Sequence, residues 1–469
     1  MTTGHTVEKI GGTSISRADE LMDTLFLKSD GDGPYNRVFV VSAFGGITDL
    51  LLEHKKSGEP GVYGHFAAAE SDLRWSEALD RAAARMGEEH ARLLDHAADR
   101  QEADEFLRDR IEGARSCLLD LQRLTSYGHF RLSDQMLTIR ELLSGLGESH
   151  SAKVVTLMLN RRGVDARLVD LSGWRDESHP DLETRLTGAM EGVDFACELP
   201  IVTGYAQCRE GLMREYDRGY SEVTFAHIAA LTGAREAVIH KEFHLSSADP
   251  KLVGEDKVVK IGRTDYDVAD QLSNLGMEAV HPNAAKILRQ AGIPLRVANA
   301  FDPGDAGTLI LAEVDADPRV EMVTGLPVAA LAVHEPDMVG VKGYDAAILE
   351  ALTRFDVWIV SKASNANTIT HYVDPNLKAL RRVESAIEKA FPKAEIDIRK
   401  IALISAVGRD LLKLEVPARG LRALVAAGIE VLGVHALARG VDVQFLVPEE
   451  RLKEAVAAIH EALVEAGQG

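Results

Sequence analysis

A lysine and two glycines lie near the start of the chain, where a strand pattern gives way to a helix pattern. Residues 9–14 read KIGGTS and follow a short apolar strand pattern at residues 5–10. Glycines at such a turn leave backbone N–H groups open to an anion, because no side chain obstructs its approach. Lys9 would stand beside that anion as a point charge. The string is not a Walker loop, since the lysine precedes the glycines, and an ordinary strand-to-helix turn explains it equally well.

The same arrangement recurs one strand later. Residues 41–49 read VSAFGGITD, in which an apolar strand runs into two glycines and then into a helix that begins near Thr48. Open α/β sheets bind ligands at the carboxyl ends of their strands, so this turn predicts a second anion or carboxylate site.

A third candidate follows the apolar strand at residues 199–202. Residues 216–222 read YDRGYSE, and Ser221 is a good N-cap for a helix predicted over residues 222–231. In the simplest interpretation Arg218 is a solvated loop charge and Ser221 only a cap. In the functional interpretation Arg218 binds a substrate carboxylate with its planar, two-pronged guanidinium group.

Neither the histidines nor the cysteines indicate a metal site. His240 and His244 are four residues apart, but their segment leaves a strand and lacks the H-E-x-x-H order, so a structural role is favoured. Cys117, Cys197 and Cys208 are too widely spaced for paired metal knuckles and are odd in number, so they are expected to be reduced thiols.

The elements that must position these residues alternate between strand and helix. This alternation implies an α/β fold with a mostly parallel sheet covered on both faces. A gap in the alternation at about residues 66–124 is rich in Ala, Leu, Glu and Arg and predicts a helical arm. The predicted strands are residues 5–10, 38–42, 153–157, 166–169, 199–205, 237–239 and 295–297.

The last third of the chain contains an internal repeat. Residues 356–373 align without a gap on residues 430–447, an offset of 74 residues. Each half reads strand, helix, strand, strand, helix, which suits a pair of small ferredoxin-like βαββαβ units. The alternative, two incidental amphipathic segments, is disfavoured by the gapless register.

Composition restricts the class of protein. The chain has 469 residues, enough for two to four domains, and a formal net charge of −20. That charge repels a phosphate backbone, so no nucleic-acid partner is expected. No apolar run approaches the roughly 20 residues of a membrane span, and residues 1–9 are polar, so we expect a cytoplasmic protein without a membrane partner.

Taken together, these strings resemble the aspartate kinases of the amino-acid-kinase superfamily. The resemblance covers nearly the whole chain, with the family's motifs in their usual order. The matching motifs are K-F-G-G-T-S at residues 9–14, S-A-x-x-G-[IV]-T-[DN] at 42–49, R-G-G-S-D at 218–222, T-x-D-P-[RK] at 247–251, G-x-x-x-[LV]-H-P at 276–282 and N-x-F-x-P-x-x-x-G-T-L-I at 299–310.

The resemblance implies a domain organisation. Residues 1–315 would form a three-layer α-β-α amino-acid-kinase domain that includes the helical arm. Residues 325–395 and 396–469 would form two ACT units, the ferredoxin-like modules with which aspartate kinases end. Through these units the chain is expected to form a homodimer or a higher homo-oligomer.

The resemblance also implies an activity, the phosphorylation of L-aspartate by ATP and Mg²⁺ to give 4-phospho-L-aspartate and ADP. Catalysis of such a transfer is mainly positioning and charge neutralisation. The residue roles implied by the family are catalytic for Lys9 and Glu222, with Glu222 orienting the metal or its water; ATP or phosphate binding for Gly11, Gly12, Ser14, Asp249 and Lys251; and aspartate binding for Ser42, Thr48, Arg218 and Ser221.

Two departures from the family pattern bear on the subgroup. The family's G-E-x-L-S corresponds to residues 126–133, which contain no glutamate, so the group that contacts the substrate's α-amino group stays open. The W-T-D-V-x-G string is replaced at residues 240–246. These strings look most like the aspartate kinases encoded beside ectoine-synthesis genes, which implies that the product feeds ectoine synthesis.

Two other functions remain as alternatives. One is another carboxylate kinase of the superfamily, acting on glutamate or N-acetylglutamate, although R-G-x-S-[DE] combined with tandem ACT units favours aspartate. The other is a non-catalytic amino-acid sensor with a decayed kinase fold, which the intact Lys9-x-Gly-Gly string disfavours.

Overall fold

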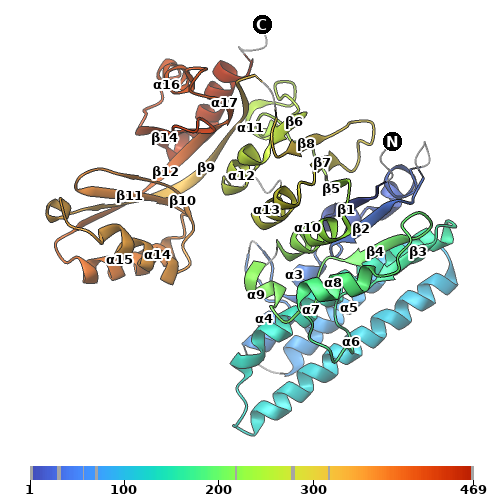
Figure 1. Ribbon diagram of the computed structural model, residues 1–469. Helices are drawn as coiled ribbons and strands as arrows, with labels where there is room; N and C mark the ends of the chain where they lie inside the picture. Colours follow the sequence, from blue (N-terminus) through green and yellow to red (C-terminus); the bar gives the residue numbers. More distant parts are fainter. Residues whose placement is uncertain are drawn as a thin grey trace. The chain divides into compact units, whose positions relative to one another are not determined.

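The protein is described by a computed structural model (Figure 1). It describes residues 4–28, 33–55, 57–68, 72–216, 219–275, 280–314 and 317–465. The chain divides into two compact units that do not follow the sequence in simple order. Unit 1 consists of Met1–His244 and Val280–Ala312, and unit 2 consists of Leu245–Ala279 and Glu313–Gly469.

Unit 1 is built on a mostly parallel sheet, as the sequence predicts. Its strands lie in the order β3-β4-β2-β1-β5-β7-β8, and within it only the pair β7 and β8 is antiparallel among the described strands. Every residue of β1, β2 and β4 is buried, which explains why these strands read as continuous apolar runs. The bounds are β1 Thr6–Ile10, β2 Arg37–Val41, β3 Ala166–Val169, β4 Leu199–Thr203, β5 Glu236–Lys241, β7 Leu295–Asn299 and β8 Thr308–Leu311.

Helices pack on this sheet and carry several of the candidate residues. Helix α10 (Tyr220–Thr232) packs on β1 and β2 and against α13 (Pro282–Ala291), whereas α7 (Met136–Arg161) packs on β3 and β4. Short helices α1 (Gly12–Ile15) and α3 (Ile47–Leu51) follow β1 and β2 directly. The α/β fold predicted for this part of the chain is therefore confirmed.

The strand predicted at residues 153–157 is wrong, because these residues lie within α7. The β-branched pair Val154 and Val155 suggested a strand. Both residues are fully buried, as are most residues around the central turns of α7, so the helix has no polar face. A helix that is buried on all sides shows no 3.6-residue periodicity, which is the signal that separates a helix from a strand.

The helical arm predicted at about residues 66–124 is a helical hairpin. After α4 (Val62–Ala67), helix α5 (Asp72–Leu93) and helix α6 (Ala97–Ser126) pack side by side, and the chain turns at residues 94–96 (Figure 1). Figure 1 shows α5 and α6 as the long helices in blue and cyan. Helix α5 also contacts α3 and α7.

Unit 2 contains an antiparallel sheet in the order β10-β11-β9-β12-β14-β13. Two strands, β9 and β12, are long and run beside each other over their whole length. The strand bounds are β9 Arg319–His334, β10 Ile359–Ser364, β11 Thr368–Val373, β12 Glu395–Arg409, β13 Gly433–Ala436 and β14 Asp442–Pro448; the helices between and after them are α14 Tyr344–Arg354, α15 Leu377–Ala390, α16 Val416–Ala426 and α17 Leu452–Leu463.

The two long strands complete two βαββαβ units. Residues 329–334 of β9 pair with β11, and residues 401–407 of β12 pair with β14. The remaining residues of β12 supply the fourth strand of the first unit, and the remaining residues of β9 supply the fourth strand of the second unit. The 74-residue repeat is thereby confirmed, because β10 and β13 start at equivalent positions, as do β11 and β14. The sequence could not show that each long strand serves both units, since each of these strands reads as one continuous element.

Residues 245–279 belong to unit 2, although they precede unit 1's last helix and strands in the chain. Helix α11 (Pro250–Val253) packs on α17, and helix α12 (Tyr266–Asn274) packs on β12. Ala248 and Val253 are part of the hydrophobic core formed by β12, β14 and α17. The predicted division of the chain near residue 315 stays a prediction, but a cut there would separate this segment from its core.

Truncation tests this arrangement. A chain ending near residue 316 should melt at a lower temperature and be cleaved by proteases within residues 245–275, because Ala248 and Val253 would lose their apolar neighbours. Thermal melting and limited proteolysis measure this, with a chain ending at Glu465 as the control. Equal melting temperatures and equal protease resistance of the two chains would contradict it.

Candidate active site

Two lysines converge on one glutamate at the carboxyl end of the unit 1 sheet. Lys9 near the end of β1 and Lys241 at the end of β5 are brought together because β1 and β5 are parallel neighbours. Their Nζ atoms lie 3.4 Å and 3.5 Å from Oε1 of Glu222, which stands in the first turn of α10. The backbone N–H of His281 donates to Oε2 of Glu222 at 2.6 Å. The structure thus joins the two residues predicted to be catalytic, Lys9 and Glu222, and adds Lys241.

Lys9, Lys241 and Glu222 together carry a net positive charge. Burial alone would raise the pKa of Glu222, but the nearby ammonium groups of Lys9 and Lys241 outweigh burial and lower its pKa to about 2. Glu222 is therefore ionised throughout the physiological pH range. Two ammonium groups facing one carboxylate carry a net positive charge, which suits an anionic ligand.

The glycine turn after β1 lies beside this cluster. A Cβ atom built on Gly11 would be 3.8 Å from Nζ of Lys9, and one built on Gly12 would be 2.7 Å from the carbonyl oxygen of Ala43. Gly12 is required because the two glycine turns touch through their backbones at this point. Ser14 is buried, and its hydroxyl donates to Glu242 at 2.7 Å. The predicted phosphate residues Gly11 and Gly12 thus lie next to Lys9, whereas the Ser14 side chain is already engaged.

A buried carboxylate that the sequence interpretation missed lies next to this cluster. Glu148 on α7 is 2% exposed, and its Oε1 accepts from the Ser221 hydroxyl at 2.8 Å. Its Oε2 is buried and has no hydrogen-bond partner among the described residues. Burial raises the pKa of Glu148 to about 8, and the hydrogen bond from Ser221 offsets only part of this effect. Ser221 adjoins Glu222, so the two carboxylates flank the start of α10.

A sequence signal for Glu148 was present but was assigned to another segment. Residues 147–151 read GESHS and fit G-E-x-L-S except for His150 in place of leucine. Residues 147–151 match this motif better than residues 126–133, because they contain a glutamate that binds Ser221, whereas Tyr127 and Phe130 of the other segment are exposed. The extra residue and the absent glutamate there were signs of misalignment.

Ser42 and Thr48 lie on the loop and helix that pack against the helix of Glu148. Ser42 directly follows β2, and its carbonyl oxygen accepts from the Ser151 hydroxyl at 2.8 Å. Thr48 is half-buried in the first turn of α3. A Cβ atom on Gly147 would be 2.9 Å from the side chain of Ala43, so α7 and this loop are closely packed. The structure thus brings Ser42, Thr48 and Ser221 to one region.

The structure does not test the other three predicted site residues. Arg218 lies outside the described residues. Asp249 and Lys251 belong to unit 2, where the Asp249 side chain caps α11 by accepting from the backbone N–H of Lys251 at 2.9 Å. Their assignment to the nucleotide stays a prediction.

The two histidines of residues 240–244 each contact a carboxylate. Nε2 of His240 lies 2.7 Å from Glu8, which also binds Arg37, so His240 has the structural role that was favoured. His244 lies 3.0 Å from Asp302, and with Asp305 these residues bring potential ligand atoms within 4.8 Å of one another. The expectation that the protein itself holds no metal site is therefore still a prediction.

Comparisons with known proteins show the family of the chain. Residues 5–299 match the model of the amino acid kinase family. The chain is 50% identical over 464 residues, 98% of each protein, to Aspartate kinase Ask_Ect of Stutzerimonas stutzeri. It is 23% identical to the chloroplastic Aspartokinase 2 of Arabidopsis thaliana, covering 98% of this chain and 84% of that one.

Solved structures share the fold. E. coli aspartokinase III in complex with aspartate and ADP superposes with a TM-score of 0.72 at 20% identity, covering 98% of this chain and 99% of that one. The Clostridium acetobutylicum aspartate kinase gives a TM-score of 0.72 at 18% identity, covering 98% of this chain and all of the other. Among the described residues, no helix combines the length and apolar character needed to cross a membrane.

Proposed function

Because the chain belongs to the amino acid kinase family and, within it, to the aspartate kinases, we propose that the cluster around Lys9 and Glu148 transfers the γ-phosphoryl group of ATP to the side-chain carboxylate of L-aspartate. The observation that carries the proposal is the position of Glu148. It is a buried carboxylate with an unpartnered oxygen, and it binds Ser221, the neighbour of a glutamate that faces two lysines. The site therefore offers an ammonium acceptor beside a phosphate-binding charge cluster.

The reaction needs no protein nucleophile. An oxygen of the aspartate carboxylate forms a bond to the γ-phosphorus while the bond from that phosphorus to the β–γ bridging oxygen breaks, leaving ADP. Negative charge spreads over the equatorial oxygens and the leaving oxygen in the transition state. Lys9 and Lys241 would neutralise that charge, and Glu222 would hold both ammonium groups in position.

The residues present fit a nucleotide phosphate and its Mg²⁺. Gly11 has no side chain that would obstruct an anion beside Lys9, and the two lysines exceed Glu222 in charge. Gly12 would bind the phosphate by family resemblance. Mg²⁺, carried with the phosphates, would supply further charge neutralisation. Glu222, ionised at every relevant pH, is the carboxylate that would orient the metal or its water. Asp249 and Lys251 would face the nucleotide, by family resemblance.

Aspartate would be held at its three charged groups. Glu148 would accept hydrogen bonds from the α-ammonium group, and Arg218 would bind the α-carboxylate, by family resemblance. Ser42, Thr48 and Ser221 would bind the remaining oxygens. N-acetylglutamate has no ammonium group, so a buried Glu148 disfavours that substrate.

A coupled ADP-release assay tests the proposal when acyl phosphate is trapped as a hydroxamate. We expect ADP and hydroxamate in equal amounts with L-aspartate, and little of either with glutamate or N-acetylglutamate. Absence of hydroxamate with every acid, together with ATP binding in a titration, would point to an amino-acid sensor. Absence of ATP binding as well would exclude a kinase.

Replacing Arg218 with Ala should act mainly on aspartate. Loss of a two-pronged ion pair in a dry pocket costs about 2 to 5 kcal/mol, so the KM for aspartate should rise at least ~30-fold while the KM for ATP changes little. Arg214→Ala is the matched control, since Arg214 is exposed on the preceding helix. A KM for aspartate within about twofold of wild type in Arg218→Ala would identify Arg218 as a solvated loop charge.

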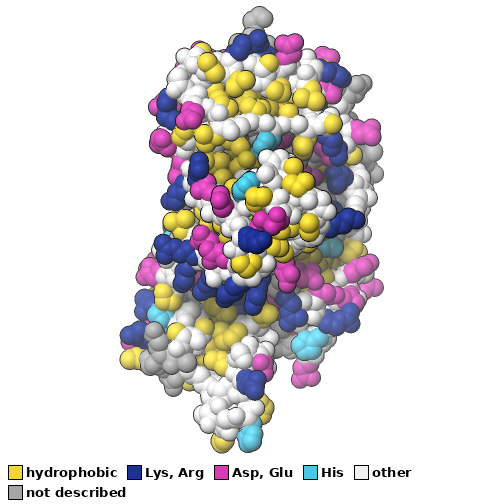
Figure 2. All heavy atoms as spheres, turned by 90° about the vertical axis from the view of Figure 1, so that its left-hand side faces the viewer, with side chains coloured by type: hydrophobic (Ala, Val, Ile, Leu, Met, Phe, Trp, Pro, Cys, Tyr) yellow, Lys and Arg dark blue, Asp and Glu magenta, His cyan; other side chains and the backbone are white. Residues whose placement is uncertain are grey.

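Unit 2 is proposed to form the subunit interface of a homodimer or higher homo-oligomer. Exposed large hydrophobic residues of unit 2 include Leu421 and Val425, one helical turn apart on α16, and Leu437. Figure 2 shows hydrophobic side chains exposed among charged ones on one face of the molecule.

We further propose a cytoplasmic enzyme whose product feeds ectoine synthesis, a step supported by the strings shared with that subgroup.

A further inference from the structure

The two glycine turns of the active site must keep a fixed separation. By the proposed function, the turn after β1 holds the phosphate and the turn after β2 leads into the aspartate-binding loop. The turns adjoin because Ile10 and Val41 are partners on parallel strands. A displacement of one turn against the other would move the carboxylate out of line with the γ-phosphorus, and phosphoryl transfer depends on that alignment.

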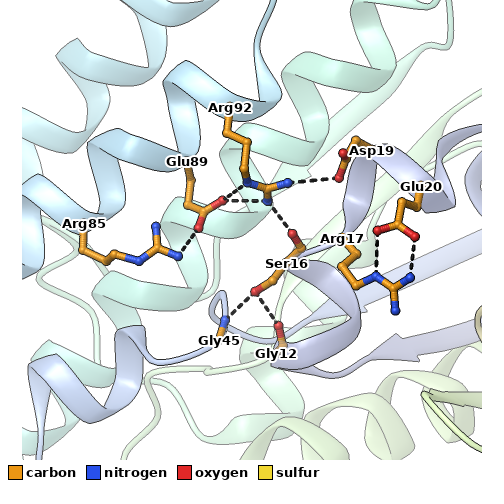
Figure 3. Close-up of polar contacts among 9 residues, drawn as sticks. All are labelled: Gly12, Ser16, Arg17, Asp19, Glu20, Gly45, Arg85, Glu89 and Arg92. Atoms are coloured by element: carbon orange, nitrogen blue, oxygen red, sulfur yellow. Dashed lines mark hydrogen bonds and ion pairs between the residues drawn. The ribbon is translucent and has the colours of Figure 1, made fainter.

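One hydroxyl group bonds to both turns. Oγ of Ser16 donates to the carbonyl oxygen of Gly12 at 2.9 Å and accepts from the backbone N–H of Gly45 at 2.7 Å (Figure 3). The first bond is common, because serine in a helix often binds the carbonyl four residues earlier. The second bond crosses 29 residues of sequence to the other turn. It also occupies the Gly45 N–H, so that donor is not available to a substrate anion.

The helical arm holds Ser16 from the other side. Arg92 on α5 donates to the carbonyl oxygen of Ser16, and its Nη1 also binds Asp19 at 3.1 Å. The Arg92 guanidinium is in turn fixed by Glu89, whose Oε2 accepts from Nε and Nη2 at 2.9 Å and 2.7 Å. Glu89 is only 1% exposed and binds Arg85 at 2.5 Å through its other oxygen. Figure 3 shows these contacts as one continuous network from α5 to both turns.

We propose that Ser16 is a positioning residue for phosphoryl transfer, with Arg92 as its support from the helical arm. The inference rests on the proposed function for the meaning of the two turns. Ser16 does not touch a substrate in this account. It sets the separation of the turn that holds the phosphate from the turn that leads to the aspartate carboxylate.

The test compares Ser16→Ala with Ser16→Thr, which keeps the hydroxyl. We expect Ser16→Ala to lower kcat about tenfold with both KM values within about threefold of wild type, because alignment is lost while binding groups stay. More ADP than hydroxamate should form, since water can then compete for the γ-phosphorus. Ser16→Thr should restore kcat to within about threefold of wild type.

Controls separate positioning from general destabilisation. Ser144→Ala removes another hydroxyl that donates to the carbonyl four residues earlier, at 2.9 Å, and should leave kcat within about twofold. Exchange of the Gly45 amide hydrogen should quicken in Ser16→Ala, a result that can be read whatever reaction the enzyme catalyses. Wild-type activity in the same assay tests the proposed function separately.

Two results would overturn the inference about Ser16. One is an unchanged kcat in Ser16→Ala, and the other is a loss in Ser16→Thr as large as that in Ser16→Ala. Arg92→Met should give a smaller loss of kcat that does not add to that of Ser16→Ala, because both changes release the same contact. Full additivity would show that Arg92 acts independently of Ser16.

Discussion

Lys9→Met is expected to lower kcat by at least ~10²-fold with only a modest change in the KM for ATP. The reason is that charge develops on the transferring phosphoryl group, so Lys9 stabilises the transition state more than the bound nucleotide. Steady-state kinetics with saturating aspartate measures both constants. The folded state should persist, because Lys241 stays 3.5 Å from Glu222 and still compensates its charge.

Two further variants test whether the loss of kcat is specific to the lysines that face Glu222. Lys241→Met should also lower kcat, since its Nζ faces the same Glu222 oxygen as Lys9. Lys393→Met is the matched control, because its side chain is 80% exposed in unit 2 and should leave kcat unchanged. A folded Lys9→Met enzyme with near-wild-type kcat would remove Lys9 from the catalytic residues.

The KM for aspartate is expected to depend on pH through Glu148. Its pKa of about 8 means that it is largely protonated at pH 7, whereas binding of the substrate's ammonium group requires the carboxylate. The KM should therefore rise by up to about tenfold for each pH unit below 8 and level off above it. The KM for ATP should not follow this profile. A KM for aspartate that stays constant between pH 6 and pH 9 would contradict the role of Glu148.

Glu148→Gln should lose this pH profile and bind aspartate poorly. Loss of one partner of a buried ion pair costs about 2 to 5 kcal/mol, so the KM for aspartate should rise at least ~30-fold. The matched control is Glu141→Gln, the same change on the same helix, where burial also raises the pKa of the carboxyl group. Glu141→Gln should keep the pH profile of the wild type.

Glu148→Gln should also stabilise the free protein at alkaline pH. The folded-state pKa of Glu148 lies above its value of about 4.5 in an unfolded chain, so ionisation lowers the free energy of unfolding progressively between about pH 4.5 and pH 8. Glu148→Gln removes that penalty, which is roughly 5 kcal/mol at most. Melting temperatures of variant and wild type should thus diverge from pH 5 to pH 8.5 in favour of the variant. The opposite order would show that the carboxylate is stabilised in the free enzyme.

The residues around Lys9 were predictable from the sequence because their signals are local. A glycine turn after an apolar strand can be recognised from adjacent residues alone. Strands such as β1 and β2 are buried on both faces, so they read as apolar runs. The repeat of unit 2 was equally visible, since equivalent strands keep a constant offset of 74 residues. The order of motifs along the chain then sufficed to indicate a carboxylate kinase.

Tertiary structure alone decided which distant residues meet. Lys241 joins Lys9 only because β5 lies beside β1 in the sheet, and the sequence contains no trace of strand order. Glu148 was missed because its motif was sought at residues 126–133, and its contact with Ser221 depends on how α7 and α10 pack in unit 1. Residues 245–275 join unit 2 through contacts with β12 and α17, which follow them by more than a hundred residues. Hydrophobic burial depends on which surfaces meet in space, and sequence separation does not limit that choice.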